Sequence, residues 1–175
     1  MKHGTPAPKE DHDEPLVRVW TDGSSSVRDR SGGWALIAQW EGMEAMRFGY
    51  SDSATNITME LTAILRAFQF VRPAPGRRLV IATDSEYSIK ALTQWMRQWR
   101  QNGWRSSAGR KVANLELLLE VEQAMKHHRQ NGTAVTFNWV KGHSGVRMNE
   151  EVDKLAGDAR IRQRTNWSHD VDAKF

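Results

Sequence analysis

The first third of the chain alternates between apolar and polar residues in the manner of β-strands. An apolar run covers residues 16–21 and reaches a turn at residues 22–24. Residues 33–40 and 43–50 form two further runs, which a Glu-Gly turn separates. Such segments, joined by short glycine-containing turns, are typical of antiparallel strands. We therefore predict an antiparallel meander of three strands.

Beyond residue 55 the apolar spacing changes to that of helices alternating with strands. Residues 57–71 carry apolar side chains at helical spacing, and Pro73 follows the expected end of this helix. Residues 78–83 are almost entirely apolar, which indicates a strand buried on both faces. The same reasoning predicts helices at 89–99, 114–128 and 149–162 and a strand at 134–140.

This order of elements predicts the α/β class: a five-stranded mixed sheet, three antiparallel strands followed by two parallel ones, with helices on both faces. We expect one domain at residues 16–163. Residues 1–15 are polar, contain three prolines and are expected to form a flexible leader, and residues 164–175 a polar tail.

Composition narrows the class of protein. The chain has no cysteine, which excludes disulfides and thiolate metal sites and fits a cytoplasmic location. Its apolar runs are too short to span a bilayer, and its N-terminus is not a signal peptide. The net charge is +4, and residues 87–115 hold six cations and no acid. Such a segment indicates a polyanionic partner, although a solvated basic face is equally compatible with it.

Four carboxylates stand at positions that the predicted fold brings together. Asp22 and Asp84 follow the first and fourth strands, while Glu60 and Asp153 fall in the first turns of two helices. If both helices start at the same edge of the sheet, the four share one pocket. Their repulsion would be relieved by divalent cations, and oxygen ligands favour Mg²⁺ or Mn²⁺. Two such ions can promote phosphodiester cleavage.

Each acid also has an ordinary structural interpretation. Asp22 in Thr-Asp-Gly suits a turn, and Asp84 before serine suits a helix cap. Glu60 and Asp153 suit surface acids near helix N-termini. The metal-site hypothesis therefore depends on the joint placement of the four.

At these acids the sequence resembles the type 1 ribonucleases H, in the bacterial form that carries a basic protrusion. The resemblance extends from residue 16 to about residue 162 through five segments in order. These are Thr-Asp-Gly-Ser at 21–24, Thr-Asn-Ile-Thr-Met-Glu-Leu-Thr-Ala at 55–63, Thr-Asp-Ser-Glu-Tyr at 83–87, Val-Lys-Gly-His-Ser-Gly at 140–145 and Asn-Glu-Glu-Val-Asp-Lys-Leu-Ala at 149–156.

The resemblance implies a ribonuclease H-like fold and an endonuclease that cuts the RNA strand of an RNA–DNA hybrid, leaving 5′-phosphate and 3′-hydroxyl ends. It implies that Asp22, Glu60, Asp84 and Asp153 bind two Mg²⁺ ions, with Mn²⁺ as a substitute. It also implies a mobile loop in which His143 assists proton transfer or product release, and an imidazole suits that role near neutral pH. We expect a monomer.

The resemblance also implies where nucleic acid is bound. Residues 94–105 resemble the protrusion that grips the DNA strand, with Trp99 and Trp104 expected to be structural. A DNA phosphate pocket and contacts to the RNA 2′-hydroxyl are implied elsewhere, and without the family context helix capping explains the asparagines equally well. The implied contact residues are Gly23, Ser25, Thr55, Asn56, Trp95, Arg97, Arg100 and Asn114.

Three departures from the family pattern concern binding of the substrate and, for Glu86, metal affinity or pH dependence. Residues 28–31 read Arg-Asp-Arg-Ser where many members have Asn-Pro-Gly-Pro. Ile57 replaces a second asparagine, and Glu86 replaces a common glutamine. The alternatives are an inactive hybrid-binding module, another nuclease of this fold such as a junction resolvase, and a domain from a reverse transcriptase.

Overall fold

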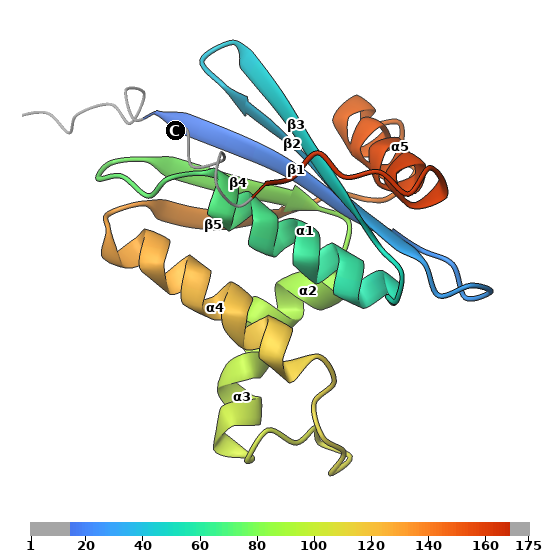
Figure 1. Cartoon of the computed structure of the whole chain (residues 1–175). Helices are drawn as coiled ribbons and strands as arrows, with labels where there is room; N and C mark the ends of the chain where they lie inside the picture. Colours follow the sequence, from blue (N-terminus) through green and yellow to red (C-terminus); the bar gives the residue numbers. More distant parts are fainter. Residues whose placement is uncertain (1–14, 169–175) are drawn as a thin grey trace, which may run out of the picture.

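The computed structural model describes residues 15–168. Its centre is a five-stranded sheet in the order β3-β2-β1-β4-β5 (Figure 1). β1 (Leu16–Ser25), β2 (Gly32–Trp40) and β3 (Met43–Ser51) pair antiparallel. β4 (Arg78–Thr83) and β5 (Ala134–Trp139) continue the sheet in parallel from β1. The predicted mixed sheet is confirmed.

Helices cover both faces, as predicted. α1 (Asn56–Phe70) and α4 (Leu115–Gln130) lie on one face and α5 (Arg147–Ile161) on the other (Figure 1). α2 (Glu86–Lys90), η1 (Ala91–Trp95) and α3 (Met96–Gln101) follow β4 and extend below the sheet. The periodicity predicted a helix at 89–99, whereas the structure contains a π-helical turn within it. The spacing of apolar residues at about 3.6 per turn does not distinguish a π-helical turn from an α-helical one.

The apolar spacing of α1 explains its position. Its buried side chains, which include Leu61, Ile64 and Phe68, face the larger core between the sheet and α4. The Thr55 side chain accepts a hydrogen bond from the Thr58 backbone nitrogen at 3.2 Å and so caps the helix. A smaller core lies under α5 on the opposite face of the sheet.

The C-terminal segment after α5 crosses the edge of β3. The Asn166 backbone nitrogen donates to the Phe48 carbonyl at 3.0 Å, and the Tyr50 nitrogen donates to the Thr165 hydroxyl at 3.0 Å. Trp167 packs edge-on against Trp34, with 5.7 Å between ring centroids. Thr165, Asn166 and Trp167 thus contact the sheet. The expected leader, apart from Pro15, and residues 169–175 of the expected tail lie outside the described residues.

Within residues 15–168, no helix combines the length and the apolar character that crossing a membrane requires.

Candidate active site

The parallel pairing of β1 with β4 aligns two of the predicted carboxylates. The register pairs Trp20 with Ala82, so Asp22 and Asp84 each lie two residues beyond the same paired position. β1 continues to Ser25, and Asp22 pairs with Ala35 of β2. The turn expected at residues 22–24 is therefore wrong, since Asp22 lies inside a strand and is only 6% exposed.

A close approach of two backbones brings Glu60 to this pair. A Cβ atom at Gly23 would lie 2.3 Å from the Glu60 backbone nitrogen and 2.5 Å from the Met59 carbonyl carbon. Only glycine allows α1 to press against β1 in this way. The end of β1 and the beginning of α1 therefore position Asp22 and Glu60 as neighbours.

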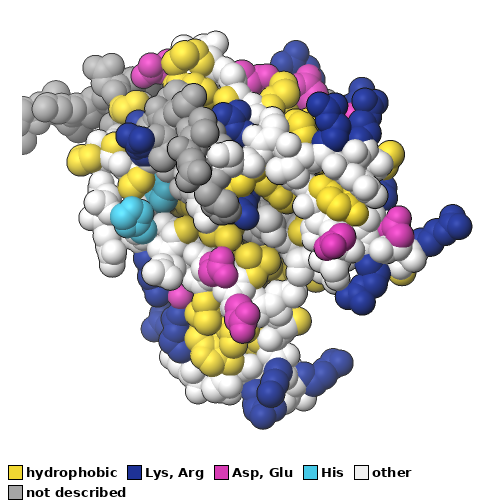
Figure 2. All heavy atoms as spheres, viewed as in Figure 1, with side chains coloured by type: hydrophobic (Ala, Val, Ile, Leu, Met, Phe, Trp, Pro, Cys, Tyr) yellow, Lys and Arg dark blue, Asp and Glu magenta, His cyan; other side chains and the backbone are white. Residues whose placement is uncertain are grey.

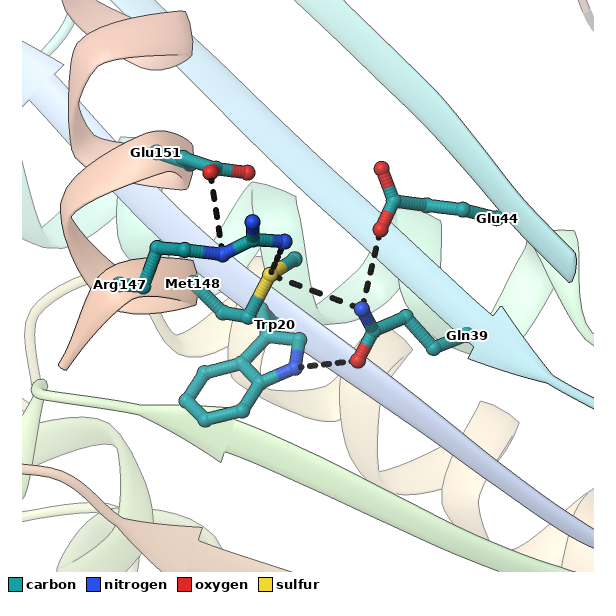
Figure 3. Close-up of polar contacts among 6 residues, drawn as sticks. All are labelled: Trp20, Gln39, Glu44, Arg147, Met148 and Glu151. Atoms are coloured by element: carbon teal, nitrogen blue, oxygen red, sulfur yellow. Dashed lines mark hydrogen bonds and ion pairs between the residues drawn. The ribbon is translucent and has the colours of Figure 1, made fainter. Parts of the chain in front are cut away.

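The other face of the sheet positions Asp153 in the same manner. A Cβ atom at Gly33 on β2 would lie 2.2 Å from the Ala156 carbonyl oxygen, so α5 rests directly on the sheet. Figure 3 shows how the first turn of α5 is fixed. The Trp20 indole donates to Gln39 Oε1 at 3.3 Å, and Gln39 Nε2 lies 3.5 Å from Met148 Sδ. Asp153 follows on the next turn of this anchored helix.

The four acids influence one another electrostatically. The pKa of Asp22 is raised to about 8, first by burial and then by the negative charge of Asp84, opposed by a hydrogen bond from the Gly23 nitrogen. Asp153 and Glu60 raise it further. The pKa of Glu60 is raised by burial and by Asp84, against a lowering hydrogen bond from Ser85. Crowding and restricted solvation therefore make Asp22 and Glu60 hold a proton more tightly than isolated carboxyl groups do.

Three of the carboxylates accept hydrogen bonds from protein donors. Asp22 Oδ1 accepts from the Gly23 nitrogen at 2.7 Å. Glu60 accepts from Asn56 Nδ2 at 2.7 Å and from the Ser85 hydroxyl. Asp84 Oδ2 lies 3.5 Å from Asn149 Nδ2.

Among residues 15–168 no three His, Asp or Glu side chains stand in an arrangement that would hold a metal ion. The carboxylates fit Mg²⁺ by their donor chemistry, because oxygen atoms are the ligands that this ion prefers.

The ordinary interpretations of the four acids do not agree with the structure. Asp22 is not in a turn, and Ser85 rather than Asp84 caps α2 by accepting a hydrogen bond from the Ser88 nitrogen. α1 has no acid in its first turn, and the first turn of α5 contains Glu150 as its acid. The prediction that Glu60 lies in the first turn of its helix is thus wrong, because α1 already begins at Asn56. Asp153 lies in the second turn of α5 and so within the first turns of that helix, as predicted.

His143 lies on the exposed loop between β5 and α5. Its backbone is left-handed, with φ of 52°. A Cβ atom at neighbouring Gly142 would lie 2.8 Å from Asp84 Oδ2, which places this loop beside the carboxylates. The Ser144 hydroxyl closes the loop by donating to the Lys141 carbonyl at 2.6 Å.

The residues expected to touch nucleic acid fall in two regions. Gly23 and Ser25 lie on β1 next to the acids, and Thr55 and Asn56 lie at the exposed N-terminus of α1. Asn114 precedes α4 in a left-handed conformation and lines a surface hollow of about 540 Å³. α1 and α4 begin at the same end of the molecule (Figure 1).

The protrusion consists of α3 and the loop after it, where Lys and Arg side chains gather at the lower end of the molecule (Figure 2). Trp95 is half-buried between Tyr87 and Trp99, at 5.7 Å from each ring. Arg97 is exposed, whereas Arg100 pairs with Glu122 at 2.6 Å. Trp99 and Trp104 pack against the larger core, as expected.

The structure shows the surroundings of two residues that depart from the family pattern. The Ile57 side chain is partly buried against the larger core. Glu86 pairs with Lys90 at 2.5 Å on the surface of α2, so its charge is matched locally.

Sequence reasoning missed two polar residues of the site. Ser85 is 6% exposed and contacts Glu60, and Asn149 is 3% exposed and contacts Asp84. Both lie within motifs, next to Asp84 and at the expected start of the last helix, but a single sequence does not separate them from capping residues.

Comparison with known proteins identifies the family of the chain. The model of the RNase H family matches residues 14–161. A ribonuclease H of Hyphomonas neptunium is 36% identical over 155 residues, covering 87% of this chain and 98% of that relative. A ribonuclease H of Saccharopolyspora erythraea is 39% identical over 145 residues, covering 82% of this chain and 90% of that relative.

Solved structures share the fold of the chain. LC9-RNase H1, described as a type 1 RNase H with the type 2 active-site motif, aligns with a TM-score of 0.72 and 30% identity, over 90% of this chain and 77% of that one. A foamy viral protease-reverse transcriptase in complex with dsDNA, at 15% identity and a TM-score of 0.62, shares the fold. The chain belongs to the RNase H family.

Proposed function

We propose that this protein is an endonuclease that hydrolyses the RNA strand of RNA–DNA hybrids and leaves 5′-phosphate and 3′-hydroxyl ends. The observation that carries the proposal is the burial of Asp22 beside Glu60, Asp84 and Asp153, which raises the pKa of Asp22 to about 8. A fold gains no stability from such a concentration of like charge, so a bound cation is the physical reason to keep it.

The four carboxylates would hold two divalent cations, Mg²⁺ or Mn²⁺. When bound, these supply an activated water and a stabilised 3′-oxygen leaving group. Asp22 is fixed by β1, and Glu60 is oriented by hydrogen bonds from Asn56 and Ser85. His143, on its exposed loop beside Asp84, accepts or returns a proton during product release.

The remaining residues hold the hybrid. Thr55 and Asn114 contact a phosphate of the DNA strand, and Arg97, Arg100 and Trp95 grip it farther along. Arg100 must leave Glu122 or be shared with it. Gly23, Ser25 and Asn56 face the RNA strand, where bonds to the 2′-hydroxyl distinguish RNA from DNA. We also propose that the protein is monomeric and cytoplasmic.

The decisive experiment compares cleavage of labelled RNA–DNA hybrid, double-stranded RNA and double-stranded DNA, with Mg²⁺ and with chelator. We expect cleavage of the hybrid alone and only with the metal. Asp84→Asn should abolish cleavage but leave hybrid binding intact, while Asp52→Asn, at an exposed acid, should change neither. Binding without cleavage in the unmodified protein would favour an inactive binding module, and cleavage of branched or duplex DNA alone would favour a resolvase.

A further inference from the structure

The turn between β1 and β2 is joined to the loop that leads into α1. The Ala54 backbone nitrogen donates to the Arg30 carbonyl at 2.8 Å. The Arg30 guanidinium in turn donates to the Ser53 hydroxyl at 3.3 Å. Ser53 and Ala54 directly precede Thr55, so the Arg30 side chain lies on the approach to the N-terminus of α1.

The turn itself is braced and holds Arg30 in an unfavourable backbone conformation. The Ser26 nitrogen donates to the Ser31 carbonyl at 2.9 Å. Asp29 Oδ1 accepts from the Ser31 nitrogen at 3.0 Å and from its hydroxyl at 2.7 Å. Between them Arg30 has φ of 61°, a region that residues other than glycine rarely adopt. The guanidinium is thus presented from a fixed base.

The positive charge of Arg30 is not matched by an acid in the part of the chain that the structure describes. Arg30 is exposed and forms no ion pair within residues 15–168. The carboxylate of neighbouring Asp29 is directed into the turn by its hydrogen bonds from Ser31. Hydrogen bonds from Ser31 and Ser26 and the charge of Arg160 lower the pKa of Asp29 to about 2. Arg100, by contrast, is already paired with Glu122.

We propose that Arg30 binds a backbone phosphate of the DNA strand adjacent to the phosphate held at Thr55. This inference rests on the proposed function, because it needs a hybrid that lies across the N-terminus of α1. A guanidinium that already donates one hydrogen bond to Ser53 has further donors to direct at phosphate oxygens. Figure 2 shows basic side chains projecting at the far right, where Figure 1 places the β1–β2 turn.

The proposal predicts that Arg30 contributes to affinity through charge. The probe is a 20-base-pair RNA–DNA hybrid with fluorescein on the DNA strand, titrated in chelator over a range of salt concentrations. Arg30→Gly suits the left-handed backbone, so the variant should fold and melt like the parent. We expect roughly three- to tenfold weaker binding and a salt slope smaller by about one. In steady-state cleavage KM should rise while kcat is unchanged.

Two control variants separate phosphate binding from loop bracing. Arg72→Ala removes the same charge beyond the opposite end of α1 and should leave affinity and salt slope unchanged. Ser53→Ala removes the hydrogen bond to Arg30 but keeps the cation, so it should retain the salt slope. If Ser53→Ala and Arg30→Gly weaken binding equally, Arg30 only braces the loop and the proposal is overturned.

The strand is identified with DNA in which single phosphates are replaced by neutral methylphosphonates. One linkage should weaken binding of the parent protein and have no further effect on Arg30→Gly. A scan without any such linkage would overturn the proposal, even when the parent protein cleaves the hybrid normally. Absence of hybrid binding and cleavage in the parent protein would instead overturn the proposed function, so the two failures are distinct.

Discussion

The Ser85 hydroxyl donates a hydrogen bond to the Glu60 carboxylate, and the same Ser85 oxygen accepts from the Ser88 backbone nitrogen. Ser85 therefore links the cap of α2 to the acid supplied by α1. This bond lowers the pKa of Glu60 against the effects of burial and of Asp84, which raise it. The protonation of Glu60 thus depends on Ser85, a residue that carries no charge.

We predict that Ser85→Ala weakens metal-dependent cleavage by about tenfold, because a partner that orients an acidic ligand is lost. Without the hydrogen bond the pKa of Glu60 rises further, so the acidic limb of the pH–rate profile should move to higher pH. The measurement is hybrid cleavage against pH at several Mg²⁺ concentrations. Ser85→Thr keeps the hydroxyl and should restore the profile; an unshifted limb in Ser85→Ala would contradict the prediction.

Asp22 should make the protein less stable as pH rises. Its pKa is about 8 in the folded chain, against an ordinary value of 3.8 for an aspartate side chain in water, so the folded state binds the proton more tightly. The stabilising contribution is complete below pH 3.8 and is lost as pH rises through 8.

Asp22→Asn should therefore raise the free energy of unfolding at pH 9, by on the order of a few kcal/mol, and change it little at pH 4. Urea unfolding in chelator at the two pH values measures the difference. Asp52→Asn, on the surface, is the matched control. An equal effect of Asp22→Asn at both pH values would show that its carboxyl group titrates normally.

Two glycine substitutions should have opposite effects on stability. Gly23→Ala places a methyl group 2.3 Å from the Glu60 nitrogen, so α1 must move away from β1. We expect a loss of about 1–3 kcal/mol and a loss of cleavage. Gly157→Ala, in α5, meets nothing within 4 Å and should stabilise the helix by about 0.5–1 kcal/mol. Thermal and urea unfolding test both, and a neutral Gly23→Ala would disprove the close approach.

A chain that ends after Arg164 should be less stable than one that ends after Ser168. The shorter chain loses the pairing of Trp167 with Trp34 and the hydrogen bonds of Thr165 and Asn166 to β3. We expect a difference of roughly 2–4 kcal/mol in the free energy of unfolding. Equal urea midpoints for the two chains would mean that the segment adds nothing to the fold.

Much of the fold follows from local patterns. The alternation in β1–β3, the all-apolar β4 and the helical spacing of α1 each depend on which side of the element is buried, and a sequence displays that directly. The π-helical turn η1 and the continuation of β1 through Ser25 do not follow from such patterns. Pairing with β2 across the sheet determines the latter, and this partner is distant in sequence.

The sequence was sufficient to propose the four acids of the site, but not the hydrogen bonds that surround them. Asp22 and Asp84 follow from strand ends, Glu60 and Asp153 follow from the beginnings of predicted helices, and the resemblance implies that all four bind metal. Ser85 donates a hydrogen bond to Glu60, and Arg100 donates one to Glu122. The two residues of each pair are 22 or more positions apart in the sequence, and the sequence around one residue does not indicate its partner. Their discovery required the geometry of packed side chains.

The segment from Thr165 to Trp167 also has a consequence for self-association. β3 is an outer strand, and its exposed amides would otherwise be a template on which the strand of another molecule could form. Here the amides of Phe48 and Tyr50 are already bonded to Asn166 and Thr165. These two amides are therefore not available to pair with a strand of another molecule.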